Sequence, residues 1–236
     1  MRQAQESEII RLSMHVREGR PLDSFNGNNS EVQIWDKSAL VTGVYEWADQ
    51  IICATNANRN QLNALVRQLK GYPETPTAAD KIIGLKNHWS IASNQGTPLT
   101  NGAIGNISTY SLSSLYTPVY MGIENNKIQT MKANVVTEDN EVFADLVIDY
   151  NQLLTGEKTL TGKQEYMLSK NKNLPDPPLD FAYGYAITCW KSQGSEWDKV
   201  LLFEEKFPFN AVDHRKYLYT GITRAKEKLV IARNFK

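Results

Sequence analysis

The sequence has little of three things: cysteine, long hydrophobic runs and net charge. Only two cysteines, Cys53 and Cys189, occur among 236 residues, and the three histidines lie far from both. Two isolated cysteines cannot build a disulfide framework or, without further ligands, a zinc site. We therefore predict that both are reduced core residues of a cytoplasmic protein and that the chain binds no metal ion through them.

Neither the hydrophobic pattern nor the charge points to a membrane partner or a uniformly basic surface. No apolar run approaches the roughly 20 residues of a transmembrane helix, and the residues after Met1 are polar, which predicts no signal peptide. The formal net charge is zero, from 26 basic and 26 acidic residues. A strongly basic domain is thereby excluded. A local basic groove is still compatible with this balance, because electrostatic steering depends on how charges are distributed.

Hydrophobic patterning divides the chain into an α/β domain and an insertion. In residues 1–84 and 178–236, helical spacing of apolar residues alternates with short buried runs, which is typical of a layered α/β domain. From about 81 to 150, short alternating runs are separated by Gly, Asn and Ser, which predicts a small β-barrel. Residues 153–179 are polar, lysine-rich and end in prolines, as linkers do. We therefore assign residues 85–177 to an inserted small β-barrel domain plus linker.

Two polar clusters in the last third of the chain carry the strongest chemical signal. The first, Thr188-Cys-Trp-Lys-Ser-Gln-Gly-Ser-Glu196, begins in an apolar stretch, 185–189, that is predicted to be a strand leading into the start of a helix. Backbone amides and hydroxyl groups at such a junction suit phosphate groups, and Gly194 permits a close approach. The second cluster, Thr223-Arg-Ala-Lys226, precedes another apolar strand.

These clusters resemble motifs V and VI of superfamily 1 helicases, the RecD-like and UvrD-like DNA motors. The resemblance implies the second, C-terminal RecA-like domain of such a motor, with a P-loop NTPase-type parallel sheet and helices on both faces. It also implies that the insertion is the Src-homology-type β-barrel of RecD-like enzymes, which Leu99-Thr-Asn-Gly-Ala-Ile-Gly-Asn-Ile107 matches. In relatives this barrel contacts single-stranded DNA or supports strand separation. The alternative is a purely architectural role.

The resemblance also assigns roles within the first cluster. It places Gly194 and Glu196 at the nucleotide, and it places the following residues on single-stranded DNA: Thr188, Trp190, Lys191, Ser192, Gln193 and Asn56. Asn56 belongs to a polar segment with Gln61 and Asn63, where helix capping is the alternative explanation. Trp190 stands where the family usually has His, so we expect it either to stack on a base or to lie in the core. For the cluster as a whole, the alternative is an ordinary solvated turn.

Two arginines are candidates for catalysis. The resemblance makes Arg224 an arginine finger, which reaches the γ-phosphate of ATP and stabilises the charge that develops during phosphoryl transfer. It makes Arg2, in Met1-Arg-Gln-Ala, a second γ-phosphate arginine at the end of motif IV. The alternatives are a surface ion pair of Arg224 with Glu227, which contributes little, and a disordered N-terminal arginine.

The P-loop that grips Mg-ATP is absent from the sequence. A P-loop needs Gly, four residues, and then Gly-Lys-Ser or Gly-Lys-Thr, whereas the nearest stretch, 156–164, is one residue too long and ends in Gln. The acidic pair Glu204-Glu205 follows an apolar strand, but the resemblance places that strand in the second motor domain. We therefore expect ATP with Mg²⁺ to be shared with an N-terminal RecA-like domain that carries the P-loop. The chain alone is expected to be inactive.

Two hypotheses about function follow. In the first, the chain supplies the arginine finger and single-stranded DNA contacts of a RecD-like, ATP-dependent DNA helicase that moves 5′ to 3′. In the second, it is a non-catalytic single-stranded nucleic-acid-binding or regulatory module derived from a helicase. Weak, salt-dependent binding of single strands without any effect of ATP would favour the second.

Overall fold

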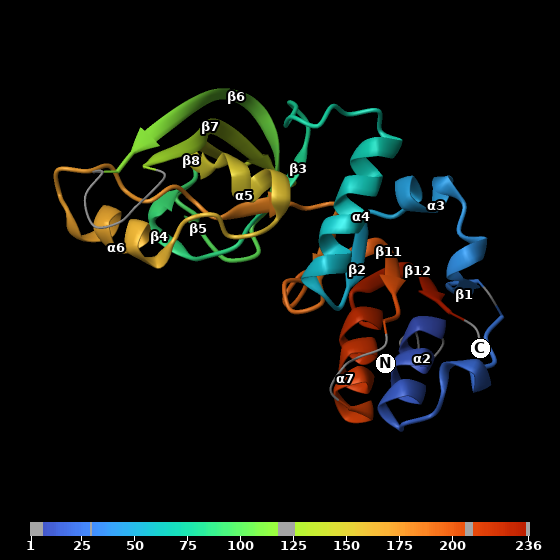
Figure 1. Cartoon of the computed structure of the whole chain (residues 1–236). Helices are drawn as coiled ribbons and strands as arrows, with labels where there is room; N and C mark the ends of the chain where they lie inside the picture. The colour runs from blue at the N-terminus through green and yellow to red at the C-terminus, as the bar shows by residue number, and fades with distance from the viewer. Residues whose placement is uncertain (1–6, 29, 118–125, 206–209, 235–236) are drawn as a thin grey trace. The chain divides into compact units, whose positions relative to one another are not determined.

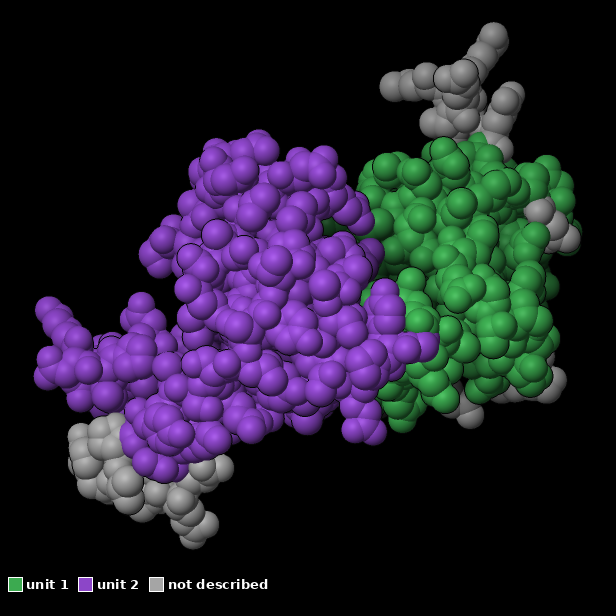
Figure 2. Space-filling view, turned by 90° about the horizontal axis from the view of Figure 1, so that it is seen from above, with its two compact units in different colours: residues 1–70, 185–236 green, residues 71–184 purple. Residues whose placement is uncertain are grey.

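The computed structural model describes residues 7–28, 30–117, 126–205 and 210–234. Two compact units make up the chain (Figure 2): the first comprises residues 1–70 and 185–236, and the second residues 71–184. These boundaries differ from the predicted ones, which lay between residues 84 and 85 and between 177 and 178. The physical reason is that the segments 81–84 and 181–183 hydrogen-bond into the sheet of the second unit.

A five-stranded parallel sheet forms the centre of the first unit (Figure 1). Its order is β1-β12-β11-β2-β10, with β1 (Val32–Asp36), β2 (Gln50–Cys53), β10 (Ala186–Thr188), β11 (Trp197–Phe203) and β12 (Ala225–Arg233). All four pairings between these strands are parallel. Strands of a parallel sheet are buried on both faces, which explains the nearly continuous apolar runs in β2 and β12.

Helices cover both faces of this sheet (Figure 1). The helices α2 (Glu8–Arg17) and α7 (Ala211–Ile222) lie on one face, and α3 (Thr42–Trp47) and α4 (Asn56–Leu69) lie on the other. Short 3-10 helices, η1 (Leu22–Ser24) and η2 (Lys37–Ala39), flank β1 in the chain. The predicted α/β domain with a parallel sheet is confirmed. None of the helices in the described part of the chain is long and apolar enough to cross a membrane.

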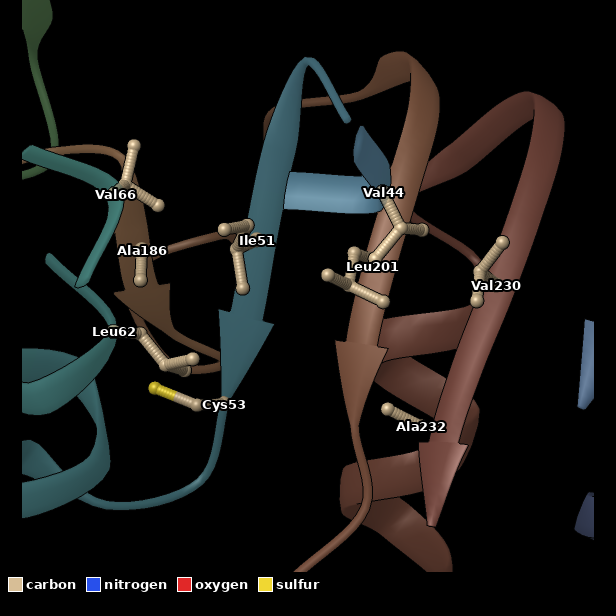
Figure 3. Close-up of a cluster of buried hydrophobic side chains, with 9 residues drawn as sticks. All are labelled: Val44, Ile51, Cys53, Leu62, Val66, Ala186, Leu201, Val230 and Ala232. Atoms are coloured by element: carbon tan, nitrogen blue, oxygen red, sulfur yellow. The ribbon is translucent and has the colours of Figure 1, made fainter. Parts of the chain in front are cut away.

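Two cores fix the sheet from opposite sides, because successive side chains of a strand point to opposite faces. One core lies under α3 and α4 (Figure 3) and contains Val44, Ile51, Cys53, Leu62, Val66, Ala186, Leu201, Val230 and Ala232. On the other face, Ile52 and Leu202 are fully buried. There α7 approaches so closely that a Cβ added at Gly221 would lie 2.6 Å from Leu202 Cδ1.

The second unit is built on a five-stranded antiparallel sheet in the order β8-β7-β6-β3-β9. Its strands are β3 (Lys81–Gly84), β6 (Ile104–Tyr116), β7 (Lys127–Thr137), β8 (Val142–Asp149) and β9 (Phe181–Tyr183). A smaller sheet pairs β4 (His88–Ala92) with β5 (Pro98–Leu99). One bridge, Ile148 to Leu179, joins the end of β8 to the segment before β9. A single bridge is not a continuous ladder, so closure into a Src-homology-type barrel stays a prediction.

The segment predicted to be a linker, 153–179, is partly helical. It contains the end of α5 (Tyr150–Thr155) and all of α6 (Gly162–Lys170). The latter begins with a capping box, in which Thr161 Oγ1 accepts from Gln164 N and Gln164 Oε1 accepts from Thr161 N. Leu153 and Leu168 are buried. These two leucines pack the segment into the second unit. The sequence did not indicate this because the segment is otherwise polar.

Candidate functional site

The first polar cluster forms a run of turns between two strands. β10 ends at Thr188, and the chain then turns towards the start of β11. Thr188 O accepts from Lys191 N at 2.8 Å and from Ser192 N at 3.2 Å, and Ser192 Oγ donates to Cys189 O at 2.7 Å. The predicted helix start is therefore wrong. Side-chain bonding to the backbone and the left-handed Gly194, with φ +88°, favour turns over a propagating helix.

Arg224 joins the second cluster to the first. Its Nη1 donates to Ser195 O at 3.0 Å, its Nε to Thr220 O at 3.2 Å and its Nη2 to Thr223 Oγ1 at 3.2 Å. Within the described residues, these neutral oxygens hold the guanidinium, and Glu227 forms no ion pair with it. A guanidinium has five N–H donors and keeps its positive charge in proteins. The half-buried side chain of Arg224 is held in place by neutral acceptors, and these do not neutralise its charge.

The residues assigned to the nucleotide gather at the amino-terminal edge of the sheet. There β11 and β12 start side by side, with Trp197 opposite Ala225 in register. Trp197 N donates to the carbonyl oxygen of Arg224 at 2.9 Å. Gly194 and Glu196, both exposed, lie on either side of the residue that Arg224 contacts and directly before β11. The structure thus brings Arg224, Gly194 and Glu196 together.

Several residues assigned to DNA lie towards the opposite, carboxyl-terminal edge. Thr188, at the end of β10, pairs in register with Cys53 at the end of β2, and Asn56 opens α4 shortly afterwards. Trp190 is 58% exposed, so it faces solvent and is not part of the core. Ser192 is fully buried, and its hydroxyl donates to a backbone carbonyl, so its side chain shapes the turn.

The other predicted residues are placed as follows. Lys191 is half-buried and Gln193 is exposed, both next to Trp190 in the turn. Lys226 forms an exposed ion pair with Asp198, Nζ to Oδ1 at 3.1 Å, and the hydrogen bond to this carboxylate raises the pKa of Lys226. Arg2 lies outside the described residues.

Sequence reasoning considered Glu205 only as part of the acidic pair Glu204-Glu205 and gave it no role in the site, whereas in the structure it orders the loop before Asn56. Its carboxylate is 7% exposed and accepts from Ala54 N at 2.6 Å, from Thr55 N at 3.4 Å and from Thr55 Oγ1 at 2.8 Å. A negative charge at the amino end of α4 also interacts favourably with the helix dipole. The available signal was an acidic residue after the apolar run of β11, but its partners lie some 150 residues away in the sequence.

Both cysteines are buried free thiols, as predicted. Burial raises the pKa of Cys189 to about 11, although the hydrogen bond with Ser192 and the charge of Arg224 oppose the shift. Burial also raises the pKa of Cys53. Because the thiolate is the reactive form, both thiols are inert at neutral pH and belong to the packing of the site.

A groove of about 990 Å³ runs beside the turn, entirely within the first unit. It is lined by residues of three segments, among them Trp190 and Gln193 of the turn, Arg17 of α2, and Val212, Arg215 and Tyr219 of α7. Thr220 also lines it, and the carbonyl oxygen of Thr220 accepts from Arg224. The groove therefore adjoins the residues that hold Arg224.

Both polar clusters, with the strands and the helix that position them, fall within one stretch of the chain. Residues 183–232 match the UvrD-like helicase C-terminal domain. The resemblance to superfamily 1 helicases that the motifs predicted is thereby confirmed. A search of curated proteins gives no match to the sequence.

Solved structures with a similar fold include Pif1 helicases from Bacteroides. One, in complex with ADP-AlF3 and single-stranded DNA, has a TM-score of 0.51 and 13% sequence identity, and the match covers 98% of this chain and 50% of that one. Another, bound to single-stranded DNA, has the same TM-score and identity, covering 97% and 49%. The likeness shows a fold similar to the RecA-like domain of superfamily 1 helicases. The chain spans about half the length of these Pif1 helicases.

Proposed function

We propose that the chain is the second RecA-like motor domain of an ATP-dependent DNA helicase of the RecD-like class, moving 5′ to 3′. In this proposal an N-terminal RecA-like domain supplies the P-loop, and ATP with Mg²⁺ lies between the two domains. The family match over residues 183–232 supports a helicase motor domain. The single observation that carries the arginine-finger role is the contact of Arg224 Nη1 with Ser195 O at 3.0 Å.

That contact matters because Ser195 belongs to the segment that links two edges of one sheet. Arg224, Gly194 and Glu196 form the nucleotide edge, while Thr188 and Asn56 lie at the other edge, where single-stranded DNA is assigned. Residues 189–196 connect the two edges directly. A movement of Arg224 towards a γ-phosphate pulls on the carbonyl of Ser195, so a change at the nucleotide is transmitted along this segment to the strand-binding edge.

The test is Arg224→Ala in the complete motor, measured as DNA-stimulated ATP hydrolysis. Loss of an arginine finger is expected to lower kcat by roughly a thousandfold or more, because the charge on the γ-phosphate oxygens is no longer stabilised. Affinity for single-stranded DNA should change little. Arg224→Lys should remain impaired, because an ammonium is a single point charge and cannot reproduce the planar fork of donors.

The matched control is Arg20→Ala. This arginine lies just after α2 and is 63% exposed in an ion pair with Glu18. Its loss should leave turnover unchanged. Turnover by Arg224→Ala equal to that of the wild type, with the fold intact by circular dichroism, would remove the arginine-finger assignment.

A second candidate function is a non-catalytic, single-stranded nucleic-acid-binding or regulatory module. The observation that favours it is that Trp190, 58% exposed in the turn, suits stacking on a base, an interaction that needs no ATP. In that case the chain binds single strands with a strong salt dependence. Addition of ATP, with or without a P-loop domain, then leaves the binding unchanged.

A further inference from the structure

We propose that the groove lined by Trp190, Arg17 and α7 is a binding surface for single-stranded nucleic acid. A base stacks on Trp190, and Arg17 and Arg215 contact phosphates. This inference rests on the proposed function, which assigns strand contacts only to the turn and to Asn56. It adds two helices, α2 and α7, to the surface that the strand follows.

The aromatic side chains of the groove suit a nucleobase. Trp190 is 58% exposed although it is a large apolar side chain. Tyr219, half-buried on α7, lines the same groove. Because every base has a π-face, stacking on such rings tolerates any sequence, as a motor that tracks along DNA requires.

The charges of the groove suit phosphate. Val212, Arg215 and Tyr219 recur at helical spacing along α7, so they share one face of the helix. Arg215 extends across the end of α2: its Nη1 lies 2.7 Å from the position of a Cβ added at Gly19. Arg17, in the last turn of α2, is exposed in the same groove.

The balance of charge in the groove is positive. Neither Arg17 nor Arg215 forms an ion pair within the described ranges of the chain. The one acidic residue among those lining the groove, Asp213, is paired with Lys216, Oδ1 to Nζ at 3.3 Å. Two arginines thus remain to attract an anion. The net charge of the chain is zero, and this groove is the local basic site that a zero net charge still permits.

The volume of the groove, about 990 Å³, lies within the roughly 300–1,000 Å³ that small-molecule pockets occupy, so the volume does not distinguish a strand from a small ligand. A free mononucleotide offers the same combination of base and phosphate, so the experiment must separate the two sources.

The experiment measures binding of a fluorescein-labelled oligothymidylate to the full chain by fluorescence anisotropy at several salt concentrations. Trp190→Ala is expected to weaken binding about 5- to 150-fold, the range that loss of one stacked base represents. Trp190→Phe should restore most of the affinity. Arg17→Ala and Arg215→Ala should each weaken binding and reduce the slope of log K against log salt by about 0.7, the value for one phosphate of a single strand.

The matched controls are Arg20→Ala, an arginine just beyond α2 whose side chain is 63% exposed, and Val41→Ala, which removes an exposed apolar side chain elsewhere in the first unit. Both should bind like the wild type.

Three results would overturn the proposal. One is failure of the wild-type chain to bind the oligonucleotide, or equal binding by all groove variants. Another is displacement of the oligonucleotide by Mg-ADP in competition, which would make the groove a mononucleotide site. The last is unchanged strand binding combined with lost ATP hydrolysis in the complete motor, which would make the groove a contact surface for the other motor domain. None of these bears on Arg224→Ala, so failure here is distinguishable from failure of the proposed function.

Discussion

Replacement of Asn63 tests how the edge of the parallel sheet, and with it the start of the functional turn, is held in place. Asn63 lies on α4 and is 3% exposed. Its Nδ2 donates to Ala186 O at 2.9 Å, and its Oδ1 accepts from Ala186 N at 2.8 Å. β10 is an edge strand whose partner in the sheet is β2. On its other side, the part of the chain that the structure describes offers these two backbone groups no strand to pair with. The side-chain amide of Asn63 takes the place of that strand.

The size of the effect follows from this geometry. Asn63→Ala leaves the N–H and the C=O of Ala186, a fully buried residue, without partners. An unsatisfied buried polar group costs about 1–3 kcal/mol, so the loss is about 2–6 kcal/mol of the free energy of unfolding. Asn63→Asp keeps the acceptor for Ala186 N but sets a carboxylate oxygen against the carbonyl of Ala186. It should destabilise the unit at pH 7 and recover in part when the carboxyl group is protonated.

The assay is urea unfolding combined with hydrogen exchange of peptides covering residues 185–190. We expect a lower midpoint and faster exchange in this segment for Asn63→Ala. Gln61→Ala is the matched control, because Gln61 is exposed on the same helix; its effect should stay within about 0.5 kcal/mol. A change of less than about 0.5 kcal/mol for Asn63→Ala would refute the view that this amide secures β10.

Two further predictions concern side chains that support the site. Glu205→Ala should lower the free energy of unfolding by about 3 kcal/mol or more, because it removes the charged acceptor of three hydrogen bonds at the start of α4; urea unfolding, with the exposed Glu46→Ala as control, checks this. Cys189→Ala should reduce the amount by which the free energy of unfolding falls at alkaline pH. The raised pKa of Cys189 means that its contribution is present below the ordinary value of 9.0 and is lost as pH rises towards about 11. The melting temperatures of variant and wild type between pH 8 and 11 should therefore converge; parallel curves would contradict the reasoning.

Only part of the candidate site could be predicted from the sequence. The string from Thr188 to Glu196 and the Arg224 cluster were found because several polar residues stand at fixed spacing beside apolar strands. The helix expected after Thr188 was wrong, because side-chain bonds to the backbone compete with helix formation and are not visible in hydrophobic periodicity. The role of Glu205 was missed because an acidic pair after a strand does not reveal which groups, some 150 residues away in the sequence, its carboxylate binds.

The domain boundaries could not be predicted from the sequence for a different reason. The stretch 81–84, Lys-Ile-Ile-Gly, has the same apolar centre as β2, Gln-Ile-Ile-Cys, and nothing local indicates which sheet it joins. Pairing with β6 and β9 places it in the second unit. Strand pairing depends on partners distant in sequence, whereas patterning reports only which face of a segment is buried.

The sequence by itself determined the α/β character of the first unit, the two buried free cysteines, the segment that matches a helicase family and the lack of a P-loop. These properties are encoded in local spacing, composition and short motifs. Only the tertiary structure decided that Arg224 contacts Ser195, 29 residues away, and that Asn63 secures Ala186, 123 residues away. It alone assembled α2, α7 and the turn into one groove. Such contacts arise from how helices and strands pack against one another, and packing brings together residues that no local pattern connects.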